Sequence, residues 1–425
     1  MEPDEELEEM KYRLTAMDPA KSTLLAGSCL FFAAFGSGSG DVAGDRRDTG
    51  FRVVPGEPPN KGILFVDHEA EGRSGHGGGT LVEAGNGDIL AFYSNVSGDA
   101  FHDGHGVGGW SEYRRSSDGG KTWSDPIVFD YSKEVWEGDE VFSALVCTVN
   151  KTGNGTLVAV VPRFADVGWN KQRPPVYFLS HDHGNTWEGP REIDPEATVE
   201  EVSMTYNGSF VCSDSGTLYI VFIGGVEAMC PGPHSLYATT DDGESFERRS
   251  FLPFQKTFNY GTGQVLEDGR LVVYTYPHLG GKGDDQTGVP ADQNDEHNLP
   301  YVISQDGGRS WSEVRTAYFA KRLRNPQMSE KIGDRYFMHG RSGLYGDDPR
   351  NLVLYSSGDG LNWDEGIVLK RNSRKDGDAY SANAVVGKRR AKDGERLLIQ
   401  SSVAYDGRFR VNIRHWWLEP IGGGG

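Results

Sequence analysis

Cysteine and basic residues are both scarce in this sequence. Its 425 residues include four cysteines, and 43 lysines and arginines stand against 62 aspartates and glutamates, which gives a formal net charge of −19. Four cysteines do not make a disulfide framework in a chain of this length. Cys212 and Cys230 could form a disulfide bond, or both could be free thiols. The acidic balance argues against nucleic acid as a partner, because phosphate binding needs a basic face.

Metal-binding patterns are missing as well. No CxxC or HExxH spacing occurs, so a structural zinc site is not expected. The carboxylate-rich stretches do not follow the spacing of a dedicated calcium loop. We therefore expect no cofactor and assign no metal ligands, and the need for a metal ion stays open.

The apolar run near the N-terminus is too short to span a membrane comfortably. It covers residues 22–36 (STLLAGSCLFFAAFG) and follows Lys11, Arg13 and Lys21. Such a length suits the apolar core of a secretory signal. We predict that residues 1–36 are a signal-like segment and that the mature protein is secreted or periplasmic, with no membrane span. A buried or interfacial segment is the alternative.

Glycine and aromatic side chains are abundant. The chain has 58 glycines, together with 9 Trp, 18 Tyr and 20 Phe. Glycine is thus about twice as frequent as its usual share of about 7%. A composition rich in turn formers and aromatics favours an all-β protein over a helical one.

A repeated eight-residue motif organises the chain. SSDGGKTW at residues 116–123 recurs as SHDHGNTW at 180–187 and as SQDGGRSW at 304–311, with weaker copies at 239–246 and 356–363. The aspartates at positions 118, 182, 241 and 306 are 64, 59 and 65 residues apart. In each copy Asp accepts backbone N–H bonds within a tight turn, Gly takes a positive φ, and Trp packs back on the strands.

The segments between the motifs predict four-stranded units. Short apolar or alternating strands such as residues 217–223 and 270–276 follow glycine turns, so each unit is strand, turn, strand, loop, strand, motif, strand. Residues 61–420 are 360 residues, or 60 for each of six units. We predict a six-bladed β-propeller of four-stranded antiparallel blades. Residues 37–60 would be a linker with a closing strand at 51–54, and residues 421–425 a glycine-rich tail.

The turn motif resembles the Asp-box, and residues 61–420 resemble the sialidase superfamily of six-bladed propellers. This resemblance implies a glycan substrate and a site built by loops at one rim of the central funnel. The site residues are therefore expected just after the first strand of each blade. The Asp-box residues themselves are expected to be scaffold.

Blades five and six match the family best. Residues 338–343 and 348–354 resemble its third-arginine segment, and Asp378-Ala-Tyr380-Ser381 resembles the segment of its tyrosine nucleophile. The resemblance implies that Arg350 holds a sugar carboxylate and that Tyr380 attacks the anomeric carbon. Arg341 is a further candidate for substrate binding.

The earlier blades supply the other candidates. In blade one, Asp99 or Asp103 of the loop at 94–109 would be the acid, and His76 stands near the position of the family's first arginine. Residues 259–264 carry no acid where the family places the Glu that activates its nucleophile. The remaining candidates for substrate binding are Arg73, His102, Arg163, Tyr260 and His278.

The substitutions leave three functions open. A sialidase-like retaining glycosidase would grip an acidic sugar with arginine and attack it with tyrosine. A polysaccharide lyase would neutralise a uronate with arginine and move protons with His and Tyr. A non-catalytic glycan-binding propeller would stack sugars on rim aromatics such as Trp110, Trp169 and Tyr345.

Overall fold

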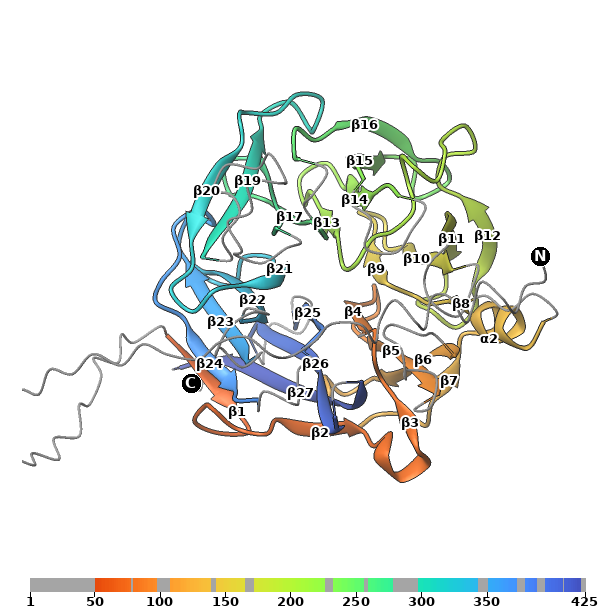
Figure 1. Cartoon of the computed structure of the whole chain (residues 1–425), viewed down its shortest axis with the longest axis vertical. Helices are drawn as coiled ribbons and strands as arrows, with labels where there is room; N and C mark the ends of the chain where they lie inside the picture. The colour runs from red at the N-terminus through yellow and green to blue at the C-terminus, as the bar shows by residue number, and fades with distance from the viewer. Residues whose placement is uncertain are drawn as a thin grey trace, which may run out of the picture. The chain divides into compact units, whose positions relative to one another are not determined.

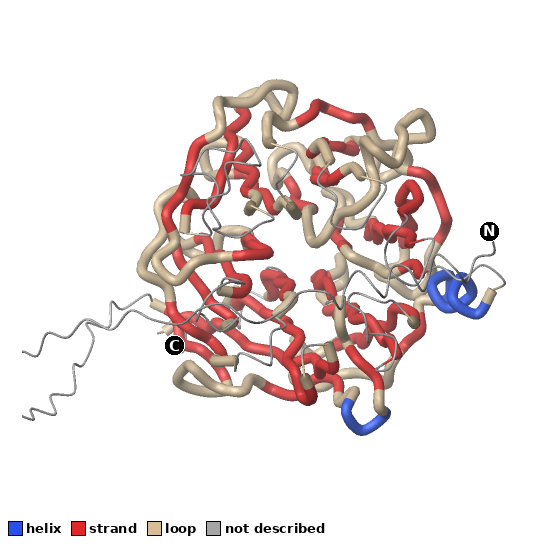
Figure 2. The backbone as a smooth tube through the Cα atoms, viewed as in Figure 1, coloured by secondary structure: helices blue, strands red, loops and turns tan. Residues whose placement is uncertain are grey.

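The computed structural model shows a propeller built almost wholly from strands (Figures 1 and 2). The residues described below are 50–77, 79–97, 108–138, 143–164, 172–225, 232–255, 259–277, 297–342, 351–372, 379–387, 394–407 and 409–421. The signal-like segment at residues 1–36 lies outside them, so it stays a prediction. Six antiparallel sheets are arranged in a ring, which confirms the fold that the repeat predicts.

Each sheet is one blade, and its strands follow one another outward from the centre of the ring. Blade one contains β3 (Arg73–Ser74), β4 (Gly79–Glu83), β5 (Ile89–Ser97), β6 (Gly109–Ser116) and β7 (Ile127–Val128). Blade two contains β8 (Ser143–Ala144), β9 (Thr148–Lys151), β10 (Leu157–Phe164), β11 (Gln172–Ser180) and β12 (Glu188–Glu192). Blade three contains β13 (Ser209–Val211), β14 (Leu218–Ile223), β15 (His234–Thr239) and β16 (Glu247–Phe251).

The second half of the chain repeats this plan. Blade four contains β17 (Thr262–Val265), β18 (Leu271–Tyr274), β19 (Asn298–Ser304) and β20 (Arg315–Tyr318). Blade five contains β21 (Arg324–Met328), β22 (Tyr336–Arg341), β23 (Leu352–Ser357) and β24 (Ile367–Lys370). Blade six contains β25 (Ser381–Val386), β26 (Arg396–Asp406) and β27 (Arg410–Pro420), to which β1 (Phe51–Val54) and β2 (Ile63–Val66) are added.

The N-terminal strand closes the ring. β1 pairs antiparallel with β27, with Phe51 opposite Pro420 and Val54 opposite Trp417. The predicted closing strand at residues 51–54 therefore completes the last blade. Because the two ends of the propeller share one sheet, the ring cannot open without breaking backbone hydrogen bonds.

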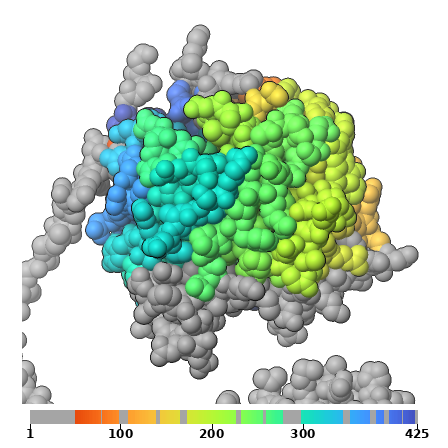
Figure 3. All heavy atoms as spheres, turned by 90° about the horizontal axis from the view of Figure 1, so that it is seen from above, coloured from red at the N-terminus to blue at the C-terminus, as the bar shows by residue number. Residues whose placement is uncertain are grey.

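Apolar side chains pack between neighbouring blades. One cluster joins blades one and two, with Leu90 and Phe92 against Leu157 and Phe178. Equivalent clusters fill the other junctions, and Trp416 of β27 is completely buried between blades five and six. Figure 3, a space-filling view, shows the residues coloured green and cyan adjoining one another on one face of the molecule.

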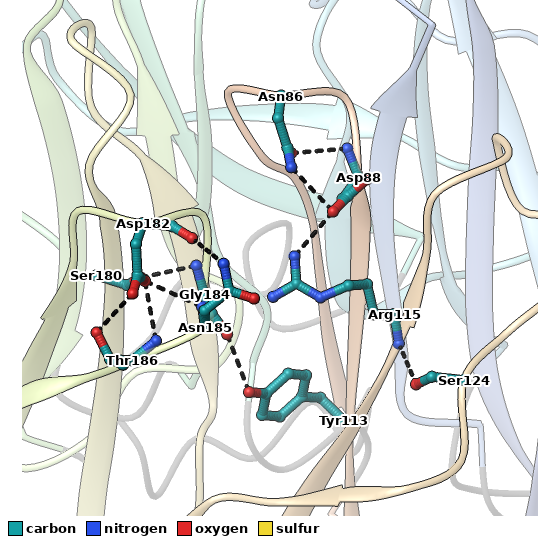
Figure 4. A network of polar contacts seen from close by, with 10 residues as sticks. All are labelled: Asn86, Asp88, Tyr113, Arg115, Ser124, Ser180, Asp182, Gly184, Asn185 and Thr186. Atoms are coloured by element: carbon teal, nitrogen blue, oxygen red, sulfur yellow. Dashed lines mark hydrogen bonds and ion pairs between the residues drawn. The ribbon is translucent and has the colours of Figure 1, made fainter.

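The Asp-boxes lie at the turns between the third and fourth strands. Asp182 accepts hydrogen bonds from Ser180 Oγ, Thr186 Oγ1 and the backbone N–H of Thr186. In Figure 4, Tyr113 of blade one donates its hydroxyl to the carbonyl of Gly184 in the Asp-box of blade two, at 3.0 Å. The motif therefore holds its own turn and also joins adjacent blades, as a scaffold element should.

The fifth copy of the motif has a shifted register. Eight-residue alignment places Gly358 at the aspartate position, but in the structure Asp359 takes that role. Its carboxylate accepts hydrogen bonds from Ser357 Oγ and from the backbone N–H of Leu361 and Asn362. The turn is one residue shorter than in the other copies, and for this reason the copy looks degenerate in sequence.

Only short helices accompany the strands in the described part of the chain. They are the 3-10 turn η1 (Glu69–Glu71) and the helix α2 (Asp130–Glu137). Within the described residues, no helix has the length and apolar character needed to cross a bilayer. Among the described residues, Cys147 and Cys212 are free thiols, and Cys230 lies outside them.

The Asp-boxes predict a specific loss of stability in acid. Partial burial raises the pKa of Asp182, but the hydrogen bonds from Thr186, Ser180 and Asn185 outweigh it and lower the pKa to about 2. A carboxyl whose pKa is lowered by folding stabilises the protein above its unfolded pKa of 3.8 and loses that contribution as the pH falls towards 2.

We therefore expect Asp182→Asn to lower the melting temperature at pH 7 and to differ less from the wild type as the pH falls from 4 to 2. Thermal melts across this pH range measure the difference in melting temperature between the wild type and the variant. Asp125→Asn, at an exposed position, is the control. A difference in melting temperature that stays constant with pH would contradict the stabilising role of the Asp182 carboxylate.

Candidate active site

Aromatic and basic side chains converge where the innermost strands begin. His76 precedes β4, Tyr206 precedes β13, Tyr260 precedes β17 and Tyr380 precedes β25. Site residues were expected just after the first strand of each blade, whereas these four side chains precede those strands and so lie at their opposite ends. We call the group formed by His76, Tyr206, Tyr260, Tyr276, Arg324, Arg341 and Tyr380 the tyrosine–arginine cluster.

Tyr380 lies at the centre of this cluster. Its ring is 5.5 Å from the ring of His76 and 5.4 Å from that of Tyr206, both edge to face. The guanidinium carbon of Arg341 lies 5.0 Å from the centre of the Tyr380 ring. The side chain is buried, with 7% exposed, so its neighbours rather than solvent set its orientation.

Two buried arginines lie on directly paired strand positions. Arg324 begins β21 and Arg341 ends β22, and the register places them opposite each other. They are 3% and 4% exposed. Like charges on opposed strand positions repel, so an anion that both side chains contact would offset this repulsion. The pair is therefore suited to hold a carboxylate.

Tyr260 and Tyr276 line the wall beside these arginines. The Tyr206 and Tyr260 rings are 5.5 Å apart, and the Tyr260 and Tyr276 rings are 6.4 Å apart. Burial raises the pKa of Tyr276 to about 12, although the nearby Arg324 and Arg341 guanidinium groups act in the other direction. Burial also raises the pKa of Tyr260 well above its ordinary value. Both phenols are therefore protonated at neutral pH and can donate hydrogen bonds.

Two predicted arginines make contacts within their own blades. Arg73 donates from Nε to Asn95 Oδ1 at 2.7 Å and from Nη2 to the Asn95 carbonyl, and its guanidinium lies over the Trp110 ring. Arg163 donates to the carbonyl of Pro174 at 2.8 Å. It lies within β10. Ligand contacts by these two residues stay predictions.

Five other predicted residues fall outside the described part of the chain. They are Asp99, His102, Asp103, His278 and Arg350. The rim aromatics Trp169 and Tyr345 do so as well. Their roles stay predictions. Of the site residues predicted from the sequence, the tyrosine–arginine cluster contains His76, Tyr260, Arg341 and Tyr380.

Three cluster members were missed in the sequence. Arg324 stands in the segment Arg-Asn-Pro-Gln, and the register of β21 shifts between Arg324 and Gln327, so no periodic pattern marks it. Tyr206 and Tyr276 sit beside loops of different blades. A signal was available, since each falls at the same end of its blade as Tyr380, but reading it requires strand boundaries accurate to one or two residues.

A cavity of about 260 Å³ lies away from the cluster, towards the far ends of the innermost strands. Its lining is mixed and includes the polar Glu83, Gln264 and Asn383 beside the apolar Leu81 and Val385. No group of three or more His, Cys, Asp and Glu in the described residues is placed to hold a metal ion.

The family of the chain follows from its sequence and agrees with this fold. The BNR repeat-like domain matches residues 176–415, more than half of the chain. A comparison with curated protein sequences finds no significant match. The protein thus belongs to the BNR repeat-like family.

Solved structures share the fold at low sequence identity. A Dyadobacter fermentans DSM 18053 protein of unknown function is 15% identical with a TM-score of 0.63, covering 88% of this chain and all of its own. The Hadza microbial sialidase Hz136 is 16% identical with a TM-score of 0.57, covering 83% and 67%. The Ruminococcus gnavus intramolecular trans-sialidase is 11% identical with a TM-score of 0.52, covering 83% and 96%.

Proposed function

We propose that this protein is a sialidase-like retaining glycosidase that removes terminal acidic sugars from glycans at the tyrosine–arginine cluster. The opposed, buried pair Arg324 and Arg341 beside Tyr380 is the observation that carries the proposal. Guanidinium groups bind carboxylates in a planar, bidentate geometry. If Arg324 and Arg341 bind the carboxylate of a sugar, Tyr380 would face the anomeric carbon of that sugar.

The reaction would proceed in two steps. Tyr380 attacks the anomeric carbon while its hydroxyl proton passes to His76, and the glycosidic C–O bond breaks as Asp99 or Asp103 protonates the leaving oxygen. Water then attacks the glycosyl–tyrosine bond, the same aspartate takes the proton of this water, and Tyr380 leaves and regains its proton from His76. The configuration at the anomeric carbon is retained.

A uronate lyase is the second candidate, and the His76–Tyr380 contact favours it. In that reaction an arginine neutralises the uronate carboxylate, and either His76 or Tyr380 removes the proton from the carbon next to this carboxylate. The C–O bond at the neighbouring carbon breaks, a C=C bond forms, and the other member protonates the leaving oxygen. An activating carboxylate at residues 259–264 is not required, which suits a sequence that has none there.

A substrate panel separates these functions. The protein lacking residues 1–36 is assayed with a fluorogenic α-sialoside and with uronate-containing polysaccharides, the latter by ultraviolet absorbance of unsaturated products. We expect sialoside turnover with retention. Unsaturated products without sialoside turnover would establish the lyase, and glycan affinity without either product would leave a binding propeller.

A further inference from the structure

A fully buried histidine connects the strand that carries Arg341 to the strand that follows Tyr380. His339 lies on β22, two residues before Arg341, and is completely buried. Its ring reaches across to blade six, where Nδ1 is 2.9 Å from Ser381 Oγ and Nε2 is 2.9 Å from Asn383 Nδ2. Ser381 directly follows Tyr380, so the bridge ends next to the proposed nucleophile.

The partners of the ring define its protonation. An amide nitrogen can only donate, so Asn383 Nδ2 requires a lone pair on His339 Nε2. The proton of the neutral ring must then be on Nδ1, from which it is donated to Ser381 Oγ. Burial lowers the pKa of His339 to about 3, which agrees with a ring that stays neutral at physiological pH.

The backbone around Tyr380 is held from two further directions. Tyr380 donates its N–H to Ser402 Oγ at 3.0 Å and accepts from the Ser402 N–H at 2.9 Å. The Tyr206 hydroxyl donates to the carbonyl of Ser381 at 3.3 Å. Of these contacts, the one from His339 fixes the Tyr380 segment relative to blade five, which carries both arginines.

We propose that His339, as a neutral ring protonated on Nδ1, is a positioning residue that sets the distance between Tyr380 and Arg341. Residues i and i+2 of a strand share a face, so His339 and Arg341 approach blade six side by side. The inference rests on the proposed function, because it assigns His339 a role in placing the nucleophile next to the arginines that bind the sugar carboxylate. His339 itself touches no substrate.

Two substitutions separate the two hydrogen bonds. His339→Asn keeps a donor near the Nδ1 position, while His339→Gln keeps an acceptor near the Nε2 position and loses the Ser381 contact. Ser381→Ala removes the acceptor alone and covers the case in which a histidine variant fails to fold. A misplacement of about 1 Å can cost about 100-fold in rate.

We expect kcat to fall about 100-fold in His339→Gln and Ser381→Ala with little change in KM, and to fall far less in His339→Asn. Losses that are equal in all three variants and follow their melting temperatures would overturn the proposal.

A measurement independent of activity tests the protonation. Nitrogen NMR of the ¹⁵N-histidine-labelled protein, which has 11 histidines, should show His339 protonated on Nδ1 alone between pH 5 and 8, identified by its absence in His339→Asn. Protonation on Nε2, or titration within this range, would overturn the proposal.

If the wild type turns over no glycan, the proposed function fails and the positioning role is decided by structure. Crystal structures should then show Tyr380 displaced from Arg341 in His339→Gln and unmoved in His339→Asn. An unmoved Tyr380 in both variants would overturn the inference.

Discussion

Tyr380→Phe is expected to remove nearly all turnover of the α-sialoside, by about 10³-fold or more in kcat, because it deletes the attacking oxygen. The phenyl ring would keep its edge contacts with His76 and Tyr206 and its place beside the Arg341 guanidinium. Folding and ligand affinity should therefore change little. Steady-state kinetics and mass spectrometry with a fluorinated sialoside, which traps the glycosyl intermediate, measure the effect.

The matched control is Tyr237→Phe. Tyr237 is completely buried in blade three and donates its hydroxyl to Asp194 at 2.8 Å. Because this hydrogen bond goes to a carboxylate, its loss should lower stability by about 1.5–3 kcal/mol and leave kcat unchanged. Full activity in Tyr380→Phe, or an adduct trapped on another residue, would contradict the nucleophile assignment.

Arg341→Gln is expected to lower kcat/KM for the sialoside by about 10²-fold to 10³-fold, mainly by removing one donor from the bound carboxylate. Arg324→Gln should act similarly. If both side chains hold the same anion, the double variant should lose less than the product of the two single losses. Arg341→Lys keeps the charge but not the planar fork, so it should recover only part of the loss.

The methyl ester of the same sialoside identifies what the arginines hold. It lacks the carboxylate charge, so Arg341→Gln should change its turnover by only a few-fold. Arg115→Gln is the control, because Arg115 is paired with Asp88 at 2.8 Å beside an Asp-box, away from the cluster. Equal losses with the acid and the ester would show that Arg341 acts through packing instead.

Most of the fold could be predicted from the sequence because its signals are local. An Asp-box turn is specified by a few consecutive residues, since Asp118 bonds to groups within four positions of itself. The spacing of the repeats then gave the number of blades. The register of the fifth copy was wrong because Asp359 closes a shorter turn with Ser357, and a fixed-length alignment cannot see that.

The candidate site was only partly predictable because it depends on distant strand ends. Tyr380 and Arg341 were found through segments that resemble a known family. Arg324 was missed, since its importance comes from lying opposite Arg341 across an irregular strand pair. His339 was visible in the segment before Arg341, but only the three-dimensional structure places its ring between Ser381 and Asn383.

The central claim is that an acidic sugar binds where the innermost strands begin. A crystal structure of the protein with an unsaturated sialic-acid analogue tests this most directly. The account predicts the carboxylate within hydrogen-bonding distance of Arg324 or Arg341 and the anomeric carbon next to the Tyr380 hydroxyl. A ligand in the cavity lined by Glu83, Gln264 and Asn383, or a cluster left empty at saturating ligand, would contradict it.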